Sequence, residues 1–343
     1  MELTPRKQAV LAAIVKAYIE TGEPVGSKVL MGLMENAPSS ATLRNEMNEL
    51  CSLGLLSQPH TSAGRVPTSN GYRLYINSLM KPSSLTESTK AYIDRFLSSA
   101  SCELKSIPCM AADVLSALTG FPAIYSFSVD DDVYLKRAEL LPFGKKGMAL
   151  FVLTSDGRTQ SRVFRLTGEV YPDVAERFKE IVDKRLKRMP LKKFDKATLQ
   201  NVVALSGLNS FDLMPLLTEI FDIAGAASES VIDISGKSEL YNLFGEESAR
   251  RIDLLIKRKE PLLKLFERKS EGTEVIFGND TGFAELSNKA IVVSKYGNNN
   301  GCCGKIGIIG PGRMSYEQII PSLEYIALKL SELMAQAKCD MEE

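Results

Sequence analysis

Four side chains between residues 41 and 48 have the types and spacing needed to recognise the edges of nucleic-acid bases. They are Ala41, Arg44, Asn45 and Asn48. In a helix each residue advances about 100°, so all four fall on one face. An arginine can donate two hydrogen bonds to guanine, and an asparagine can form two hydrogen bonds with adenine. A small apolar side chain can contact the thymine methyl group. The pattern predicts a base-reading helix, and a plain solvated helix face is the alternative.

The surrounding sequence would hold such a helix in place. Pro38 ends the preceding segment, and Ser39 or Ser40 can cap the bare amides of the new helix. The opposite face carries apolar residues at helical spacing, namely Leu43, Met47 and Leu50. The chain from Ser39 or Ser40 up to Gly54 is therefore expected to form one amphipathic helix.

A basic, turn-rich hairpin is expected directly after this helix. Gly54 ends the helix, residues 55–56 begin a strand, and Val66-Pro67 returns from the tip. A helix followed by a hairpin is typical of winged-helix proteins, in which the wing contacts phosphates. The sequence predicts that a set of polar and basic residues contacts the phosphate backbone of the nucleic acid. They are Lys28, Ser40, Thr42, His60, Thr61, Ser62 and Arg65. His60 is the single histidine of the chain, so a metal or catalytic role would lack partners.

Two helices precede the predicted reader and one follows the wing. Thr4 caps a first helix with Pro5 at its first position, and Gly22 stops it. Ser27 begins a short second helix whose inward residues are expected to be Val29, Leu30, Leu33 and Met34. Another helix starts at Thr68 or Ser69, and residues 81–84 break it. This is the order of a helix-turn-helix with its third helix as reader.

Composition excludes several classes of protein. Lysine plus arginine equals aspartate plus glutamate, 42 each in 343 residues, so binding to nucleic acid would depend on a local patch. The sequence has no signal peptide and no apolar run of about 18 residues, which predicts a cytoplasmic protein without membrane contact. The six cysteines lack CxxC spacing, which favours reduced thiols and no metal site, with a redox role for Cys302-Cys303 as the alternative. We expect no catalytic residues and no cofactor, because no nucleophile–base pair or nucleotide loop is present.

Whole phrases of the chain resemble the heat-inducible transcription repressors of the HrcA family. The matching runs are TPRKQAVLAAIVKAYIETGEPVGS, SSATLRNEMNEL, QPHTSAGRVPTSNGYRLYI and, near the other end, GKIGIIGPGRMSYEQII. The resemblance implies a repressor that binds an inverted-repeat operator of chaperone genes as a homodimer. It also implies activity that a chaperonin maintains and heat stress removes, and a GAF-like domain split by an inserted dimerisation domain.

The period of the remaining sequence predicts an α+β multidomain chain. β-like segments occur between residues 123 and 166 and again after 274, with mostly helical sequence between them. We therefore expect an N-terminal winged helix-turn-helix and a sheet domain interrupted by a mostly helical insertion, and the resemblance implies that this sheet domain is a GAF-like α/β domain. The expected limits are 1–81 for the DNA-binding domain, 85–166 for a helical connector and the first part of the GAF-like domain, 167–270 for the inserted dimerisation domain, and 271–343 for the second part and a closing helix.

Two further stretches allow competing interpretations. The basic run at 172–208 is interpreted as a solvated helix face rather than a second DNA patch, because it also carries an apolar side. Residues 304–312, GKIGIIGPG, lack the order of a phosphate-binding loop and are interpreted as a strand and turn before a helix. Arg313 and Ser315 beside that helix start form a possible anion site. The alternative function is a small-ligand-sensing transcriptional regulator that uses the GAF-like domain.

Overall fold

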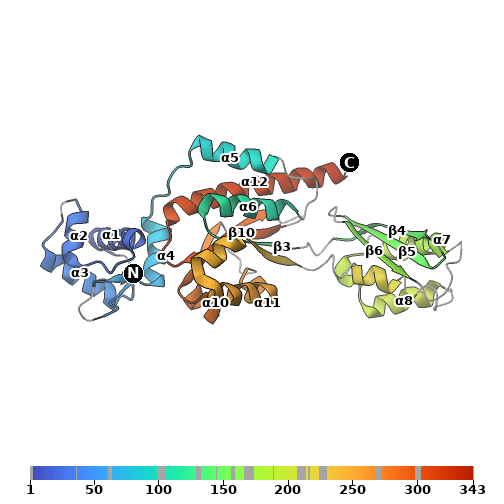
Figure 1. Cartoon of the computed structure of the whole chain (residues 1–343), viewed down its shortest axis with the longest axis horizontal. Coiled ribbons are helices and arrows are strands. Elements are labelled where there is room, and N and C mark those ends of the chain that lie inside the picture. The colour runs from blue at the N-terminus through green and yellow to red at the C-terminus, as the bar shows by residue number, and fades with distance from the viewer. Residues whose placement is uncertain are drawn as a thin grey trace.

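The computed structural model places three parts in a row, with the N-terminal helices at one end, a central sheet domain, and a smaller sheet-and-helix unit at the other end (Figure 1). It describes residues 3–35, 37–60, 64–98, 106–128, 133–143, 145–155, 159–165, 174–187, 189–206, 214, 217–223, 230–266, 272–297 and 303–342.

The first part is a winged-helix domain. Its elements are α1 (Pro5–Thr21), α2 (Ser27–Leu33), α3 (Ser40–Ser52), β1 (Leu56–Ser57), β2 (Val66–Pro67), α4 (Ser69–Leu74) and a π-helical turn, η1 (Tyr75–Leu79). The Thr4 side chain accepts a hydrogen bond from the Lys7 amide, and Gly22 caps the other end of α1 in the left-handed region. The order of elements expected from the sequence is confirmed.

The short helix α2 faces the core differently from the prediction. Of its expected inward residues, Leu30 is buried, whereas Val29 and Leu33 are 59% and 54% exposed. Because α2 has only seven residues, few of its side chains can be buried against α1 and α3, and Leu30 is the apolar one that is buried. Val29 and Leu33 are four positions apart and therefore share one side of the helix, which faces solvent.

The central domain is a five-stranded antiparallel sheet between two layers of helices. Its strand order is β7-β3-β10-β9-β8. The strands are β3 (Ala123–Ser128), β7 (Val231–Ser235), β8 (Thr273–Phe277), β9 (Lys289–Gly297) and β10 (Cys303–Pro311). One layer contains α5 (Glu87–Ser98), α6 (Ser106–Thr119) and α12 (Tyr316–Glu342), and the other contains α10 (Lys237–Lys257) and α11 (Glu260–Phe266). Short 3₁₀ turns at 278–280 and 284–286 connect β8 to β9.

The residues GKIGIIGPG belong to β10 and the turn after it, as the sequence predicted. β10 is the central strand, paired with β3 on one side and β9 on the other. A Cβ atom at Gly307 would lie 2.0 Å from the Val292 carbonyl oxygen, so the close strand approach requires glycine there. Cys303 begins this strand as a free thiol, and Cys302 lies outside the described residues. The closing helix α12 packs on β9, α6 and α5, which places its apolar stripe on this chain's own sheet.

The third part is a separate three-stranded sheet with helices on one side. It contains β4 (Leu135–Phe143), β5 (Gly147–Thr154), β6 (Thr159–Arg165), α7 (Val174–Ile181), a π-helical turn (Val182–Leu186), a 3₁₀ turn (Leu191–Lys193) and α8 (Lys196–Ser206). The apolar side of the basic segment is buried, with Phe178 and Leu186 fully enclosed. Its lysines form i,i+4 ion pairs, such as Lys184 with Glu180 at 2.7 Å. This geometry agrees with the interpretation of a solvated basic face.

The strand pairing divides the chain differently from the limits expected at 167 and 270. β7 pairs with β3 in the central sheet, so residues 231–266 belong to the central domain. β4, β5 and β6 pair only with one another among the described strands, so residues 135–165 belong to the inserted unit. The inserted unit therefore lies between β3 and β7, and its described residues include a three-stranded sheet as well as helices. Local periodicity identified most of the strands but not their partners, because pairing depends on contacts distant in sequence.

Candidate nucleic-acid interface

The helix α3 exposes the side chains that were predicted to read bases. Leu43, Met47 and Leu50 are buried against the other helices. The opposite face of α3 carries the exposed residues Ala41, Arg44, Asn45 and Asn48. Arg44 makes no ion pair with any described residue, so its guanidinium is available to a ligand. The apolar face anchors the helix, and its polar face is thereby directed outward.

A hydroxyl pair fixes the turn between α2 and α3. The Oγ atoms of Ser27 and Ser40 are 2.8 Å apart, and the Ser39 Oγ accepts a hydrogen bond of 3.2 Å from the Thr42 amide. Ser39 is therefore the N-cap of α3. The side chain of Ser40, which is predicted as a phosphate contact, also joins the two helices of the helix-turn-helix through this bond. Thr42 Oγ1 lies 2.9 Å from Ser39 Oγ at the same helix start.

The wing is tied to both α3 and the turn before α2. Arg65 and Val25 exchange two backbone hydrogen bonds of 2.9 Å. The Arg65 side chain donates a hydrogen bond of 2.7 Å from Nη2 to Oδ1 of Asn48. Lys28 and His60 are exposed, as a phosphate contact requires. The predicted wing residues Thr61 and Ser62 lie outside the described part of the chain.

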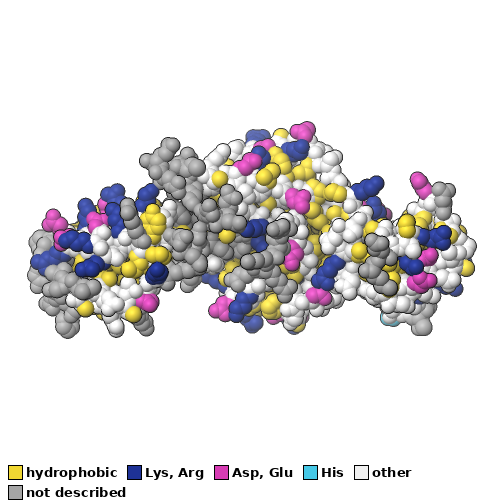
Figure 2. All heavy atoms as spheres, turned by 180° about the vertical axis from the view of Figure 1, so that it is seen from behind, with side chains coloured by type: hydrophobic (Ala, Val, Ile, Leu, Met, Phe, Trp, Pro, Cys, Tyr) yellow, Lys and Arg dark blue, Asp and Glu magenta, His cyan; other side chains and the backbone are white. Residues whose placement is uncertain are grey.

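Charge is distributed in small groups rather than over one broad basic face. Lys7 binds Glu49 at 2.7 Å and Glu46 at 3.8 Å, which neutralises acidic side chains on α3 away from its reading face. On the face shown in Figure 2, Lys and Arg side chains are interspersed with Asp and Glu over all three parts. Local contacts must therefore supply any affinity for an anion.

The winged-helix domain is fastened to the central domain by Glu317, in the first turn of α12. The carboxylate of Glu317 accepts hydrogen bonds from the Tyr75 hydroxyl and from Lys16 Nζ, the latter at 3.0 Å. Its backbone carbonyl accepts a 2.9 Å bond from the Ser83 amide. Burial opposes ionisation, but the bonds from Tyr75 and Lys16 lower the pKa of Glu317 below its ordinary value. A second bridge joins Arg73 to Asp280 at 2.6 Å.

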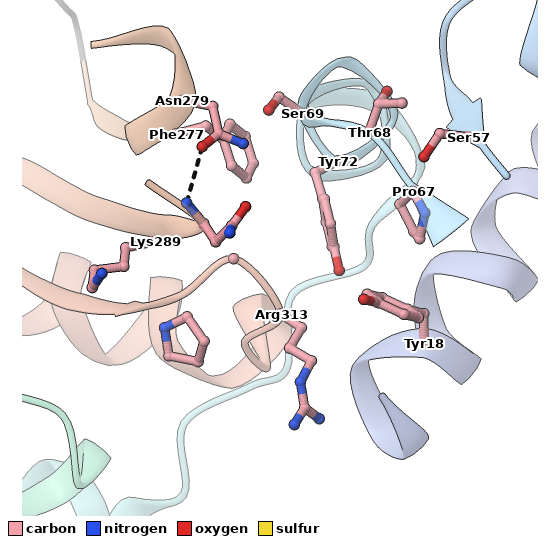
Figure 3. A pocket seen from close by; sticks show the side chains of 13 residues that line it. Tyr18, Ser57, Pro67, Thr68, Ser69, Tyr72, Phe277, Asn279, Lys289 and Arg313 are labelled. Carbon is pink, nitrogen blue, oxygen red and sulfur yellow. Dashed lines mark hydrogen bonds between the residues drawn. The ribbon is translucent and has the colours of Figure 1, made fainter. Parts of the chain in front are cut away.

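A cavity of about 490 Å³ lies at the same seam between the two domains (Figure 3). The winged-helix domain contributes Tyr18, Ser57, Pro67, Thr68, Ser69 and Tyr72, and the central domain contributes Phe277, Asn279, Asn288, Lys289, Pro311, Gly312 and Arg313. Arg313, predicted as part of an anion site, lines this cavity, whereas Ser315 does not. No local pattern in the sequence indicates that these aromatic residues meet, because their partners are more than 200 residues away.

No metal site and no membrane span occur in the described ranges. No group of three or more His, Cys, Asp or Glu side chains in those ranges has the arrangement of a metal site. Likewise, none of the helices described is both long and apolar enough to cross a membrane.

The N-terminal geometry defines the class of protein. Three helices, an exposed polar reading face on the third, and a following hairpin make a winged helix-turn-helix of the kind that binds DNA. Residues 2–80 match the family described as "Winged helix-turn-helix transcription repressor, HrcA DNA-binding", and residues 109–320 match "HrcA protein C terminal domain". The chain belongs to the HrcA family of heat-inducible transcription repressors.

Relatives in this family match almost end to end. The heat-inducible transcription repressor HrcA of Acholeplasma laidlawii (strain PG-8A) is 33% identical over 342 residues, covering 96% of this chain and 97% of the relative. That of Moorella thermoacetica (strain ATCC 39073 / JCM 9320) is 30% identical over 344 residues, with coverage of 98% and 99%. These relatives are named as repressors, which agrees with the expectation that the chain is not an enzyme.

A solved structure shares the fold over the full length. A crystal structure titled as a hypothetical protein at 2.2 Å superposes with a TM-score of 0.64 at 24% identity, covering 98% of this chain and 100% of the other. This similarity supports the arrangement of the mixed helical and sheet parts.

Proposed function

We propose that this repressor binds an inverted-repeat operator as a dimer, with α3 of each protomer in a major groove. The observation that carries the proposal is the exposed row of Ala41, Arg44, Asn45 and Asn48 on a helix whose other face is buried. These side chains offer hydrogen bonds to guanine and adenine and an apolar contact to thymine. Lys28, His60 and Arg65 would then contact the phosphates that flank the groove.

The uncovered face of the inserted sheet supports the dimer. Leu141 pairs with Ala149, which pairs with Val163, so the three lie in one row across β4, β5 and β6. Leu141 and Val163 are 56% and 69% exposed, and Phe143 and Phe151 are exposed nearby. The opposite face of the same sheet is buried by the unit's own helices. An apolar sheet face of this kind favours burial against a second copy, and a two-fold dimer presents two identical readers to an inverted repeat.

Binding should be tested by fluorescence anisotropy on a labelled inverted-repeat duplex and on a scrambled duplex, across several salt concentrations. Specific repressors bind their operator at least about 10³-fold more tightly than unrelated DNA. We expect a discrimination of that size. Weak binding to both duplexes with a steep salt slope, from protein shown to be folded, would contradict specific recognition.

The topology of the central sheet supports dependence on a chaperonin. The central strand β10 pairs with β3 through residues such as Lys305 and Ser126, which are 179 positions apart in sequence. Pairings this distant form slowly and leave apolar strands exposed during folding. Chaperonin would raise the fraction of folded repressor, and heat, by occupying chaperonin with other unfolded chains, would free the operator.

Refolding tests this second part of the proposal. The chain is diluted from denaturant with and without chaperonin and ATP, and active repressor is counted by titration with operator DNA. We expect a higher yield with chaperonin, and more so at higher protein concentration, because aggregation competes with slow pairing. An identical yield under both conditions would count against chaperonin dependence.

A further inference from the structure

The cavity at the seam is lined by apolar side chains, by hydroxyl and amide side chains, and by the two cations Lys289 and Arg313. Its walls include the side chains of Pro67, Phe277 and Pro311. The centre of the Tyr72 ring lies 5.7 Å from that of Phe277 and 5.9 Å from that of Tyr316, and the rings are tilted relative to one another. A volume of about 490 Å³ falls within the range typical of small-molecule sites.

The Tyr72 hydroxyl is buried without a partner. Tyr72 is 5% exposed, and its oxygen makes no hydrogen bond to any residue that the structure describes. Buried tyrosine hydroxyls ordinarily have a partner, because leaving one unpaired is unfavourable. Burial raises the pKa of Tyr72, so it remains a neutral hydrogen-bond donor throughout the physiological range.

Two other polar groups lie beside that hydroxyl. Figure 3 shows the hydroxyl ends of Tyr18 and Tyr72 directed toward each other, with the Arg313 side chain beginning near them and its guanidinium extending away from the two hydroxyls. Arg313 forms no ion pair within the described ranges. Its guanidinium lies against Gly22, where an added Cβ atom would be 2.7 Å from Nη1. An unpaired guanidinium and two phenolic donors form a set that suits a carboxylate or phosphate group.

The polar rim of the cavity is already ordered. The Asn279 side chain accepts a hydrogen bond of 2.9 Å from the Asn288 amide, which fixes the loop before β9 (Figure 3). Lys289 has a lowered pKa because it is partly buried, and its Nζ lies 5.2 Å from the centre of the Phe244 ring. Lys289 is therefore engaged elsewhere, and Arg313 is the other cation that lines the cavity.

We propose that this cavity binds a small organic anion with an aromatic or apolar body, whose charged group contacts Arg313, Tyr72 and Tyr18. The apolar body lies against Pro67, Phe277 and Pro311. Because the lining comes from both domains, the bound anion fixes the winged-helix domain on the central domain. The effect on operator binding rests on the proposed repressor function, but the binding itself does not.

Calorimetric titration of the full-length chain without DNA tests the site. The probes are benzoate, phenyl phosphate and the neutral benzamide, at constant ionic strength. We expect at least one anion to bind and benzamide to bind at least about tenfold more weakly. The midpoint temperature of thermal unfolding should rise by about 4 °C when that anion is present at one hundred times its Kd. Failure of both anions to bind, or equal binding of benzamide, would overturn the proposal.

Variants separate the site from general effects on folding. Arg313→Gln and Tyr72→Phe should each lower the affinity for the anion by about tenfold or more. Arg258 is an exposed arginine at the end of α10, and Arg258→Gln should leave the affinity unchanged. Without ligand, Tyr72→Phe should unfold at the same or a higher temperature, because it removes an unpaired buried hydroxyl. Unchanged anion affinity in both site variants would refute the assignment. Operator discrimination is measured separately, so its failure is not confused with loss of this site.

Discussion

The guanidinium of Arg65 and the side-chain amide of Asn48 are joined by a 2.7 Å hydrogen bond. Arg65 is the residue where the wing returns to β2, and Asn48 belongs to the reading face of α3. The wing and the reading helix are therefore one unit in the structure. A residue assigned to phosphates from the sequence thus also orients a residue assigned to bases.

Replacing Arg44 should remove one base contact. We expect Arg44→Ala to cost about 1–3 kcal/mol on the operator and to relax preference at one base pair, because a bidentate guanine contact is lost. Anisotropy on a set of singly substituted duplexes measures this. Arg250→Ala, on the exposed surface of α10, is the control. Equal losses on operator and scrambled DNA would show that Arg44 contacts phosphate instead.

Replacing Arg65 distinguishes two roles. If Arg65 contacts a phosphate, Arg65→Ala should weaken binding to the operator and to scrambled duplexes alike. It should also reduce the slope of log affinity against log salt concentration by about one. If Arg65 instead positions Asn48, Arg65→Ala should lower the discrimination between operator and scrambled DNA. Adding Asn48→Ala to that variant should then cause little further loss of affinity. We expect the uniform loss to dominate. A non-additive double variant with an unchanged salt slope would contradict that expectation.

A charge on the uncovered sheet face should break the dimer. Val163→Asp places a carboxylate at the β6 end of the row formed with Leu141 and Ala149, and burying it without a partner is unfavourable. We expect a monomer by analytical ultracentrifugation and a loss of affinity for the full repeat but not for a half-site. Leu254→Asp is the matched control, since Leu254 is 57% exposed on α10. A dimer that persists in Val163→Asp would exclude this face.

The seam at Glu317 should weaken in acid. The pKa of Glu317 is lowered from its ordinary value of 4.5 in the folded chain, so its contribution is fully present above about pH 4.5. That contribution is lost as the pH falls through the lowered folded value. Thermal unfolding measured from pH 6 to 3 should therefore show a steeper decline in the natural chain than in Glu317→Gln. Parallel curves for the two chains would show that this carboxylate does not hold the domains together.

The local sequence was sufficient to predict the reading helix. Leu43, Met47 and Leu50 recur at helical spacing, and Ser39 supplies the cap, so the exposed face of α3 follows from chain-local geometry. The same reasoning failed for α2, where seven residues are too few for periodicity to select one buried face. It also misplaced the insertion, because β4 and β7 have similar strand character but pair in different sheets.

The sequence by itself determined the winged-helix order, the exposed polar face of α3 and the strand character of residues 304–309. Only the tertiary structure decided that β7 joins β3, that Arg65 holds Asn48, and that Tyr72, Tyr18 and Arg313 meet at one cavity. The physical reason is the separation in sequence between the residues that make each contact. Helix faces and caps depend on residues three or four positions apart, whereas sheet order and the domain seam depend on contacts between residues that can be more than 200 positions apart, such as Tyr75 and Glu317.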